Sequence, residues 1–304
     1  MAATEQASSG CASTAAAAPR EALGSAYLLA FGSMVMLQGG NALGLVLIHH
    51  LGVPTSTSLR LLFGSIFLVV FLRPPRHLGS AEIRLVLVYG LVVAAMGGLI
   101  YEAVDRLPLS VAVTVSLLGP LTVAAASSRR RRDLAWPLLA LAGVILLAQA
   151  SGGEGPSVDA IGLACAAGNA VAWGTYIVLA ARAGRQFDGV HGLALACVVA
   201  AVLWLPAGIA SGGYASLTAP ILLLAILTAI IATGLPYTME NLALRRMPQR
   251  IFGILMSFEP AVAMLAGLLL LGQKPGILAL GGIALVIVAS IGASMPAAPA
   301  PAPP

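Results

Sequence analysis

The residues best placed to do chemistry in this sequence are single charged side chains inside long apolar runs. Glu259 lies about nine residues into the apolar run 250–271 and is followed by Pro260. In a helix that rises ~1.5 Å per residue, its carboxyl group would lie roughly 14 Å deep in a bilayer. Because an ionised carboxylate is costly there, we expect it to bind a proton reversibly or to pair with a buried cation. The alternative is a carboxyl group held by neighbouring Ser or Thr hydroxyls.

Arg60 is the corresponding cation, in the first third of the apolar run 56–72 and without basic neighbours. Its guanidinium could hold the carboxylate of a substrate or neutralise Glu259. The alternative is a side chain that extends to the lipid headgroups.

A second acid, Glu240, follows Tyr237 by three residues, so the two side chains share a helix face. We consider two interpretations of Glu240. It either lines a vestibule, as a second candidate for proton coupling, or it pairs with Arg245 or Arg246.

Amide side chains and glycines cluster in the first apolar run, 24–48. Gln38, Gly39, Gly40 and Asn41 are consecutive, and we expect the helix to unwind at the two glycines and to present both amides to a substrate. The alternative is close helix packing through the small residues.

The run 158–181 carries an aromatic and amide face. Asn169, Trp173 and Tyr176 are spaced by four and three residues, so they project from one side of a helix. Such a face suits a small zwitterion, whereas an aromatic anchor at the membrane interface is the alternative. The residues that we expect to contact a substrate are Gln38, Asn41, Arg60, Asn169, Trp173, Tyr176 and Tyr237.

Enzymatic chemistry finds no support in the sequence. The four histidines and three cysteines have no metal-binding spacing, and no nucleophile with a base, phosphate loop or zinc-protease signature occurs. We therefore predict that the protein is not an enzyme and that it uses no metal and no cofactor.

The elements that position these residues must span a membrane. The chain is 59% hydrophobic and 9% charged, outside the range of soluble proteins. The apolar runs are long enough to cross a bilayer and lack strand alternation, which predicts an all-α bundle of ten transmembrane helices. The runs are 24–48, 56–72, 85–104, 109–127, 134–150, 158–181, 190–211, 217–244, 250–271 and 276–295.

Loop charges predict the orientation. With a cytoplasmic N-terminus, thirteen of the sixteen basic residues fall in inside loops and two in outside loops, so both termini are predicted to be cytoplasmic. The net charge of +5 is thereby explained by topology, and we expect no nucleic-acid partner.

Two similar halves are predicted within this bundle. Arg106-Leu107-Pro108 with Gly119-Pro120 matches Arg246-Met247-Pro248 with Glu259-Pro260, and an odd number of spans per half makes the halves inverted. Pro120 and Pro260 should break their helices at matching depth, although simple packing kinks are the alternative. The predicted segments are a disordered tail 1–22, a first repeat 23–150, a connector 151–157, a second repeat 158–295 and a disordered Ala/Pro tail 296–304.

Several short runs carry a family resemblance in their order and spacing. They are Gln38-Gly39-Gly40, Leu59-Arg60-Leu61, Gly119-Pro120-Leu121, Ser127 to Arg130, Tyr176-Ile177, Leu235-Pro236-Tyr237 with Glu240, Phe252-Gly253, Met256-Ser257 and Glu259-Pro260. With these runs the chain resembles the drug/metabolite transporter superfamily with EamA-type repeats, in particular its amino-acid exporters. Two positions depart from that pattern: Gln273 replaces an expected Glu, and Glu102 an expected apolar residue.

The resemblance implies a secondary transporter of the bacterial inner membrane that exports small neutral amino acids such as threonine or homoserine, or related metabolites, by proton antiport and alternating access. Its partners would be the amino acid, protons and the lipid bilayer, and a homodimer is one candidate assembly. Glu259 is our first candidate for the proton-coupled residue. The alternatives are an exporter of another metabolite or drug, and a membrane sensor or assembly protein that transports nothing.

Overall fold

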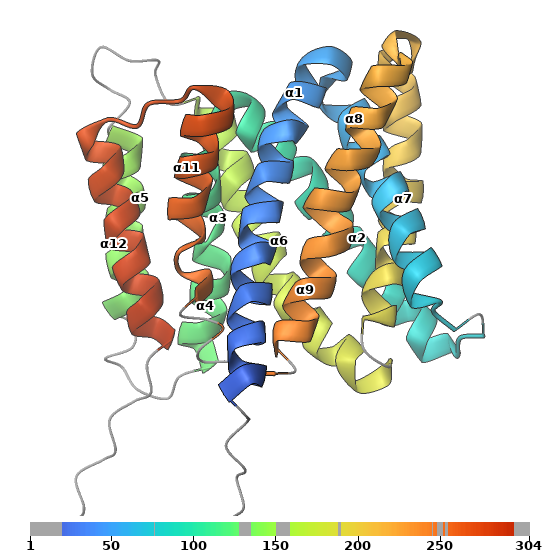
Figure 1. Cartoon of the computed structure of the whole chain (residues 1–304), viewed down its shortest axis with the longest axis horizontal. Helices are drawn as coiled ribbons and strands as arrows, with labels where there is room; N and C mark the ends of the chain where they lie inside the picture. The colour runs from blue at the N-terminus through green and yellow to red at the C-terminus, as the bar shows by residue number, and fades with distance from the viewer. Residues whose placement is uncertain are drawn as a thin grey trace, which may run out of the picture.

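The structure is a computed structural model that describes residues 20–75, 77–127, 135–149, 159–187, 190–244, 246–247, 252 and 255–294. Throughout these residues the regular elements are helices and no strand occurs, which confirms the all-α prediction for the described part of the chain. The helices stand side by side as one bundle (Figure 1). They are α1 Arg20–Leu72, α2 Ser80–Arg106, α3 Leu109–Ser116, α4 Leu118–Ser127, α5 Ala135–Gln149, α6 Ala160–Gln186, α7 His191–Ala210, η2 Gly213–Ser216, α8 Ala219–Ala229, η3 Ile230–Gly234, α9 Leu235–Leu244, α11 Glu259–Leu271 and α12 Ile277–Ser294.

Several of these helices are long and apolar enough to cross a membrane. Among the described residues, five helices meet that standard by length and composition, and further apolar helices are shorter. The five are Gly24–Leu72, Ser80–Arg106, Ala160–Gln186, His191–Ala210 and Ala219–Glu240, and the shorter ones are Leu109–Val123, Glu259–Leu271 and Ile277–Gly292. The chain is therefore consistent with a multi-pass membrane bundle, while the count of ten spans, their inversion and the side of the termini remain predictions.

The first helix, α1, consists of two arms joined by a single sharp bend. Gly52 has φ 75° and ψ 163°, a conformation that is essentially restricted to glycine, and Pro54 follows within the first turn of the second arm. The chain consequently reverses at one end of the bundle (Figure 1), so the two predicted runs 24–48 and 56–72 become neighbours. Both arms carry residues that we expected at the binding site.

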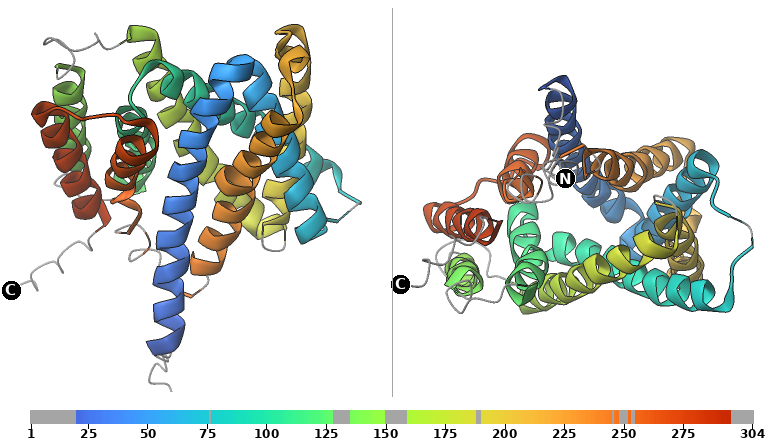
Figure 2. Two further views of the ribbon diagram at one scale, coloured as in Figure 1. Left: turned by 45° about the horizontal axis from the view of Figure 1, so that its top comes forward. Right: turned by 90° about the horizontal axis from the view of Figure 1, so that it is seen from below.

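Three other interruptions lie inside apolar segments. The helix of residues 109–127 is broken at Leu117, three residues before Pro120, and α11 begins at Glu259 with Pro260 in its first turn. The third interruption is η3, a π-helical turn between α8 and α9. Seen along the helix axes, α5 and α12 form a pair at one side of the bundle (Figure 2).

The predicted unwinding at Gly39 and Gly40 is wrong in this conformation, because α1 is helical through both residues. Gly40 instead faces η3, where an added Cβ would lie 2.6 Å from Cβ of Ala232. On the second arm, a Cβ at Gly64 would lie 3.0 Å from Cγ2 of Thr233. Gly40 and Gly64 therefore provide close packing through small residues, and this packing brings both arms of α1 against the π turn.

Two adjacent glycines allow a matched test of this packing. Gly40→Ala should destabilise the fold by about 1–3 kcal/mol, because the new methyl group cannot fit against the backbone of η3. Gly39→Ala should be neutral or stabilise by up to about 1 kcal/mol, because a methyl group there meets no described atom within 4 Å and alanine favours the helix. Thermal unfolding of the purified variants measures both effects, and equal destabilisation by the two substitutions would contradict the packing role of Gly40.

Candidate functional site

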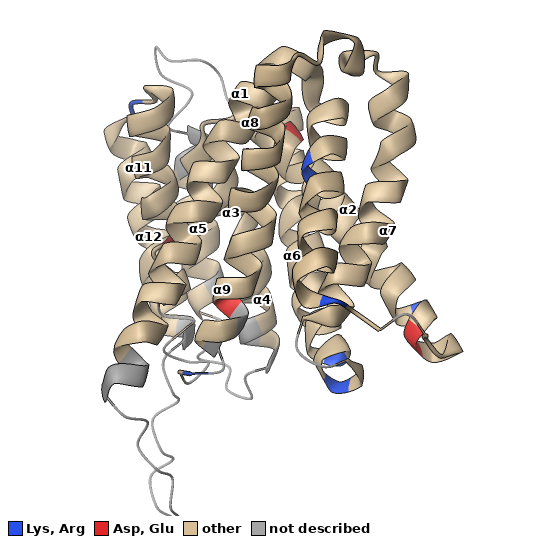
Figure 3. Cartoon of the chain, turned by 45° about the vertical axis from the view of Figure 1, so that its right-hand side comes forward, with Lys and Arg blue, Asp and Glu red and all other residues tan. Residues whose placement is uncertain are grey.

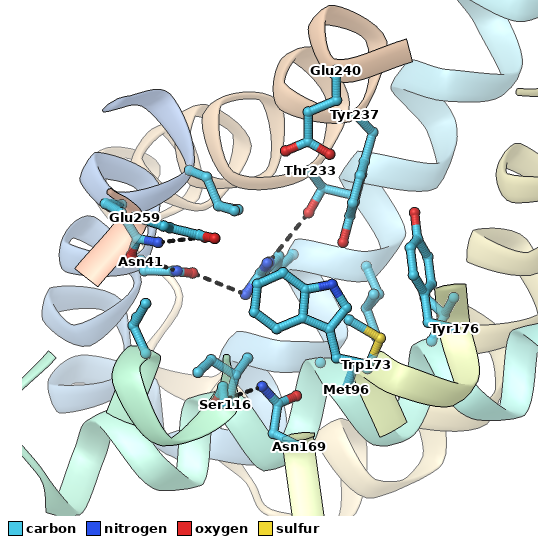
Figure 4. Close-up of a pocket in the computed structure, with 18 residues that line it drawn as sticks. Asn41, Met96, Ser116, Asn169, Trp173, Tyr176, Thr233, Tyr237, Glu240 and Glu259 are labelled. Carbon is cyan, nitrogen blue, oxygen red and sulfur yellow. Dashed lines mark hydrogen bonds between the residues drawn. The ribbon is translucent and has the colours of Figure 1, made fainter. Parts of the chain in front are cut away.

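A single pocket gathers the residues that the sequence analysis selected. It has an empty volume of about 800 Å³, including the part open to solvent. Its walls come from α1, α2, α3, α6, η3, α9 and α11. All seven expected contact residues line it together with both candidate acids: Gln38, Asn41, Arg60, Asn169, Trp173, Tyr176, Tyr237, Glu240 and Glu259 (Figure 4).

Arg60 lies at the centre of a set of hydrogen bonds inside the bundle. Its Nε donates to Oγ1 of Thr233 at 3.2 Å, Nη2 to the carbonyl oxygen of Ala232 at 3.2 Å, and Nη1 to Oδ1 of Asn41 at 3.4 Å. The guanidinium also stands 4.8 Å from the ring centroid of Tyr101, a cation–π contact. Arg60 is 6% exposed, so its side chain is buried inside the bundle.

The acceptor on Ala232 exists because of a proline four residues later. Pro236 has no N–H, so it cannot donate the helical hydrogen bond that the carbonyl of Ala232 would otherwise accept. At this point the helix forms the π turn η3, in which the N–H of Leu235 bonds to the carbonyl of Ile230. The carbonyl of Ala232 is thereby available to the guanidinium of Arg60.

The charges of Arg60 and Glu259 are joined through two amides. Asn41, which accepts from Arg60, donates from Nδ2 to Oε1 of Gln38 at 3.3 Å, and Gln38 donates from Nε2 to Oε1 of Glu259 at 2.8 Å. An arginine can only donate and an ionised carboxylate can only accept, so both amides must point the same way along this chain. Within the described residues the two charged groups form no direct ion pair, and Oε2 of Glu259, which is 2% exposed, has no hydrogen-bond partner.

Asn169 and Ser116 join the two halves of the chain on another side of the pocket. Nδ2 of Asn169 donates to Oγ of Ser116 at 2.9 Å, and Oγ of Ser116 donates to the carbonyl of Ala112 at 2.8 Å. Close approach of the helices here depends on Gly119, because a Cβ at that residue would meet the carbonyl oxygen of Ala170. The close contact at Gly119 and the hydrogen bond from Asn169 therefore hold the hydroxyl group of Ser116 beside α6.

Tyrosines form an aromatic wall. The ring centroids of Tyr89 and Tyr176 are 5.4 Å apart, and those of Tyr176 and Tyr237 are 6.1 Å apart. Glu240 lines the pocket next to Tyr237 on α9 (Figure 4). Of its two expected partners, Arg246 donates from Nη1 to Oγ of Ser25, and Arg245 lies outside the described residues.

Sequence reasoning missed four polar or aromatic residues that line the pocket or contact its lining residues. Thr233 and Ser116 stand three and four residues before a proline inside an apolar run, and that position was the available signal. Tyr101 and Tyr89 on α2 had no local signal, because their contacts with Arg60 and Tyr176 come from other helices.

The two departures from the family pattern lie at helix ends. Oε1 of Gln273 accepts a hydrogen bond from the N–H of Leu109 at 3.0 Å and so satisfies the first turn of α3. Glu102 pairs with Nε of Arg106 at 3.3 Å, and Nη1 of Arg106 reaches Asp159 at 3.3 Å. Neither Gln273 nor Glu102 lines the pocket.

Asp159 in this cluster caps α6. Its carboxylate accepts from the N–H groups of Ile161 and Gly162, and these bonds together with Arg106 hold the pKa of Asp159 below its usual value.

Figure 3 shows that most charged positions lie near the ends of the helices. In the part of the chain that the structure describes, no group of three His, Cys, Asp or Glu side chains could hold a metal ion.

The hydrogen bonds of Arg60 predict that lysine cannot replace it. Arg60→Lys keeps the charge but has one nitrogen in place of three, so buried acceptors lose their partners. We expect this loss to lower the free energy of unfolding by about 1–3 kcal/mol. The thermal midpoint of the substrate-free protein should fall by roughly 2–4 °C for each kcal/mol. Arg84→Lys, at an exposed position of α2, is the control and should leave the midpoint unchanged. Equal thermal midpoints for Arg60→Lys and Arg84→Lys would contradict a structural role for the three hydrogen bonds of the Arg60 guanidinium.

Comparisons with known proteins identify similar sequences and a similar fold. The sequence profile of the EamA-like transporter family matches residues 160–295. The threonine/homoserine exporters RhtA of Escherichia coli (strain K12) and Salmonella typhimurium (strain LT2) are each 36% identical over 264 residues, which covers 86% of this chain and 89% of the relative. A protein of known crystal structure is similar with a TM-score of 0.61 and 20% identity, over 89% of this chain and 96% of that chain, a likeness of fold alone.

Proposed function

Because the chain belongs to the EamA-like transporter family, we propose that it is a multi-pass membrane protein that exports a small neutral amino acid, or a related metabolite, across the bacterial inner membrane. The observation that carries this proposal is the pocket itself, which unites a buried cation, two acids, amides and aromatic rings within an apolar bundle. Threonine and homoserine, the substrates in the name of the relatives, are the first candidates.

The pocket offers complementary groups to both ends of a zwitterion. A guanidinium has five N–H donors, and the three hydrogen bonds of Arg60 leave two for the carboxylate of a substrate. The ammonium group would be bound by Oε2 of Glu259, a buried acceptor without a partner among the described residues. Trp173, Tyr176 and Tyr237 would enclose the rest of the molecule.

Glu259 would couple export to protons because a proton and an ammonium group compete for the same carboxylate. Ionised Glu259 accepts from Gln38 and can bind the substrate, whereas protonation removes the charge and lowers the cost of enclosing an empty site away from water. Glu240, nearer the end of α9, would be a second carboxylate on the proton path. Each turnover would then exchange substrate for protons.

The coupling cycle requires the pocket to face each side of the membrane in turn. We propose that two inverted repeats, 23–150 and 158–295, alternate access to it, with ten spans and both termini in the cytoplasm. The breaks at Leu117 and before Glu259, one in each repeat, support this arrangement because each bounds a short helix that lines the pocket.

Glu259→Gln tests the proton coupling. In proteoliposomes with an imposed pH gradient, the variant should lose the ability to concentrate substrate, because a neutral amide can neither carry a proton in one half of the cycle nor balance the charge of the ammonium group in the other. Glu102→Gln makes the same chemical change at a one-third exposed site outside the pocket and should behave as the wild type. If Glu259→Gln concentrates substrate as well as the control does, the coupling role is wrong.

Arg60→Ala tests the carboxylate subsite. Loss of two charge-assisted hydrogen bonds should weaken amino-acid binding by about tenfold or more. Equilibrium binding to the purified protein measures this effect, with Arg84→Ala as the control and the thermal midpoint as the check on folding. Unchanged affinity in a folded Arg60→Ala protein would remove Arg60 from the substrate site.

A further inference from the structure

The orientation of the Asn169 amide is fixed by its neighbours. Oγ of Ser116 donates its single hydrogen to the carbonyl of Ala112, so this oxygen can only accept from Asn169. The nitrogen of the amide must therefore face Ser116, and a flipped amide would bring two acceptors together without a hydrogen between them. The oxygen Oδ1 consequently faces the other way.

Oδ1 of Asn169 is a spare acceptor on a residue that lines the pocket. Asn169 is 4% exposed, and within the described residues Oδ1 is buried without a hydrogen-bond partner. Figure 4 shows this oxygen on the side of Trp173 and Met96, two other lining residues. A buried acceptor without a partner is destabilising, so a ligand that brings a donor to this atom gains from it.

The surroundings of this acceptor favour a neutral donor over a charged one. Trp173 and Met96 line the pocket on this side without a charge, whereas Glu240 lies at the far end of the pocket in Figure 4. An ammonium group away from a carboxylate would be buried without compensation, at a high cost. A hydroxyl group on a short aliphatic chain satisfies the acceptor and fills the apolar space beside it.

We propose that Oδ1 of Asn169 determines specificity by accepting a hydrogen bond from a hydroxyl group on the side chain of the amino-acid substrate. This proposal rests on the proposed function, because it requires that an amino acid occupies the pocket. An isosteric substrate with a methyl group in place of the hydroxyl would leave Oδ1 desolvated and unpaired, so the site would reject it. Asn169 would thus act by disfavouring the apolar analogue as well as by holding the correct substrate.

Two isosteric pairs of amino acids test the role of Asn169. Threonine with valine, and homoserine with norvaline, differ by a hydroxyl against a methyl group. Binding to the full chain in lipid nanodiscs should favour the hydroxyl member by about tenfold or more in the wild type. In Asn169→Leu this ratio should fall toward one, with an increase in affinity for valine or norvaline. A merely structural role for Asn169 would weaken all four ligands together and would leave the ratio unchanged.

Matched variants keep the test decisive. Thr122→Ala removes an exposed hydroxyl from α4, outside the pocket, and should retain the wild-type ratio. Should Asn169→Leu fail to fold, as judged by its elution and thermal midpoint, Asn169→Ala replaces it with the same expected loss of ratio. Binding of all four amino acids with a ratio near one in the wild type, or an unchanged ratio in the variant, overturns the role of Asn169 alone. A wild type that binds none of the four overturns the proposed function.

Discussion

The site is organised by the need to satisfy one buried guanidinium. A cation removed from water costs several kcal/mol unless its donors find acceptors, and Arg60 finds them on the other arm of α1, on η3 and over a ring of α2. One side chain therefore holds three segments together. The glycines of both arms are part of the same constraint, because they let η3 approach closely enough for Thr233 and the carbonyl of Ala232 to reach the guanidinium.

The fold was predictable as far as the length and composition of the apolar runs determine it. All-helical structure follows from those runs, and the glycine and proline near residue 52 explain why two predicted spans are joined by a single bend. The prediction that the helix unwinds at Gly39 and Gly40 was wrong for a physical reason. A glycine allows both an irregular backbone and a close helix contact, and the neighbour that decides between them, Ala232, is almost two hundred residues away in the sequence.

The polar members of the site were predictable because a charged or amide side chain in an apolar run must be buried against a partner. Their pairing was not predictable. Gln38 was expected to bind a substrate but also holds Glu259, and Asn41 bonds to Arg60. Hydroxyl groups carry a weaker signal, since many bond to their own helix as Thr114 and Thr122 do. Thr233 and Ser116 differ from those residues in their tertiary contacts alone.

The π turn also sets the angular phase of the helix that follows it. A turn closed between residues five apart holds one residue more than an α turn, and each residue of a helix advances by about 100°. The side chains of α9 are thus rotated by about that angle from the direction that an uninterrupted helix would give them. Tyr237 and Glu240 face the pocket in this rotated frame. Their place in the site is set by the residue count of η3 as much as by their own identity.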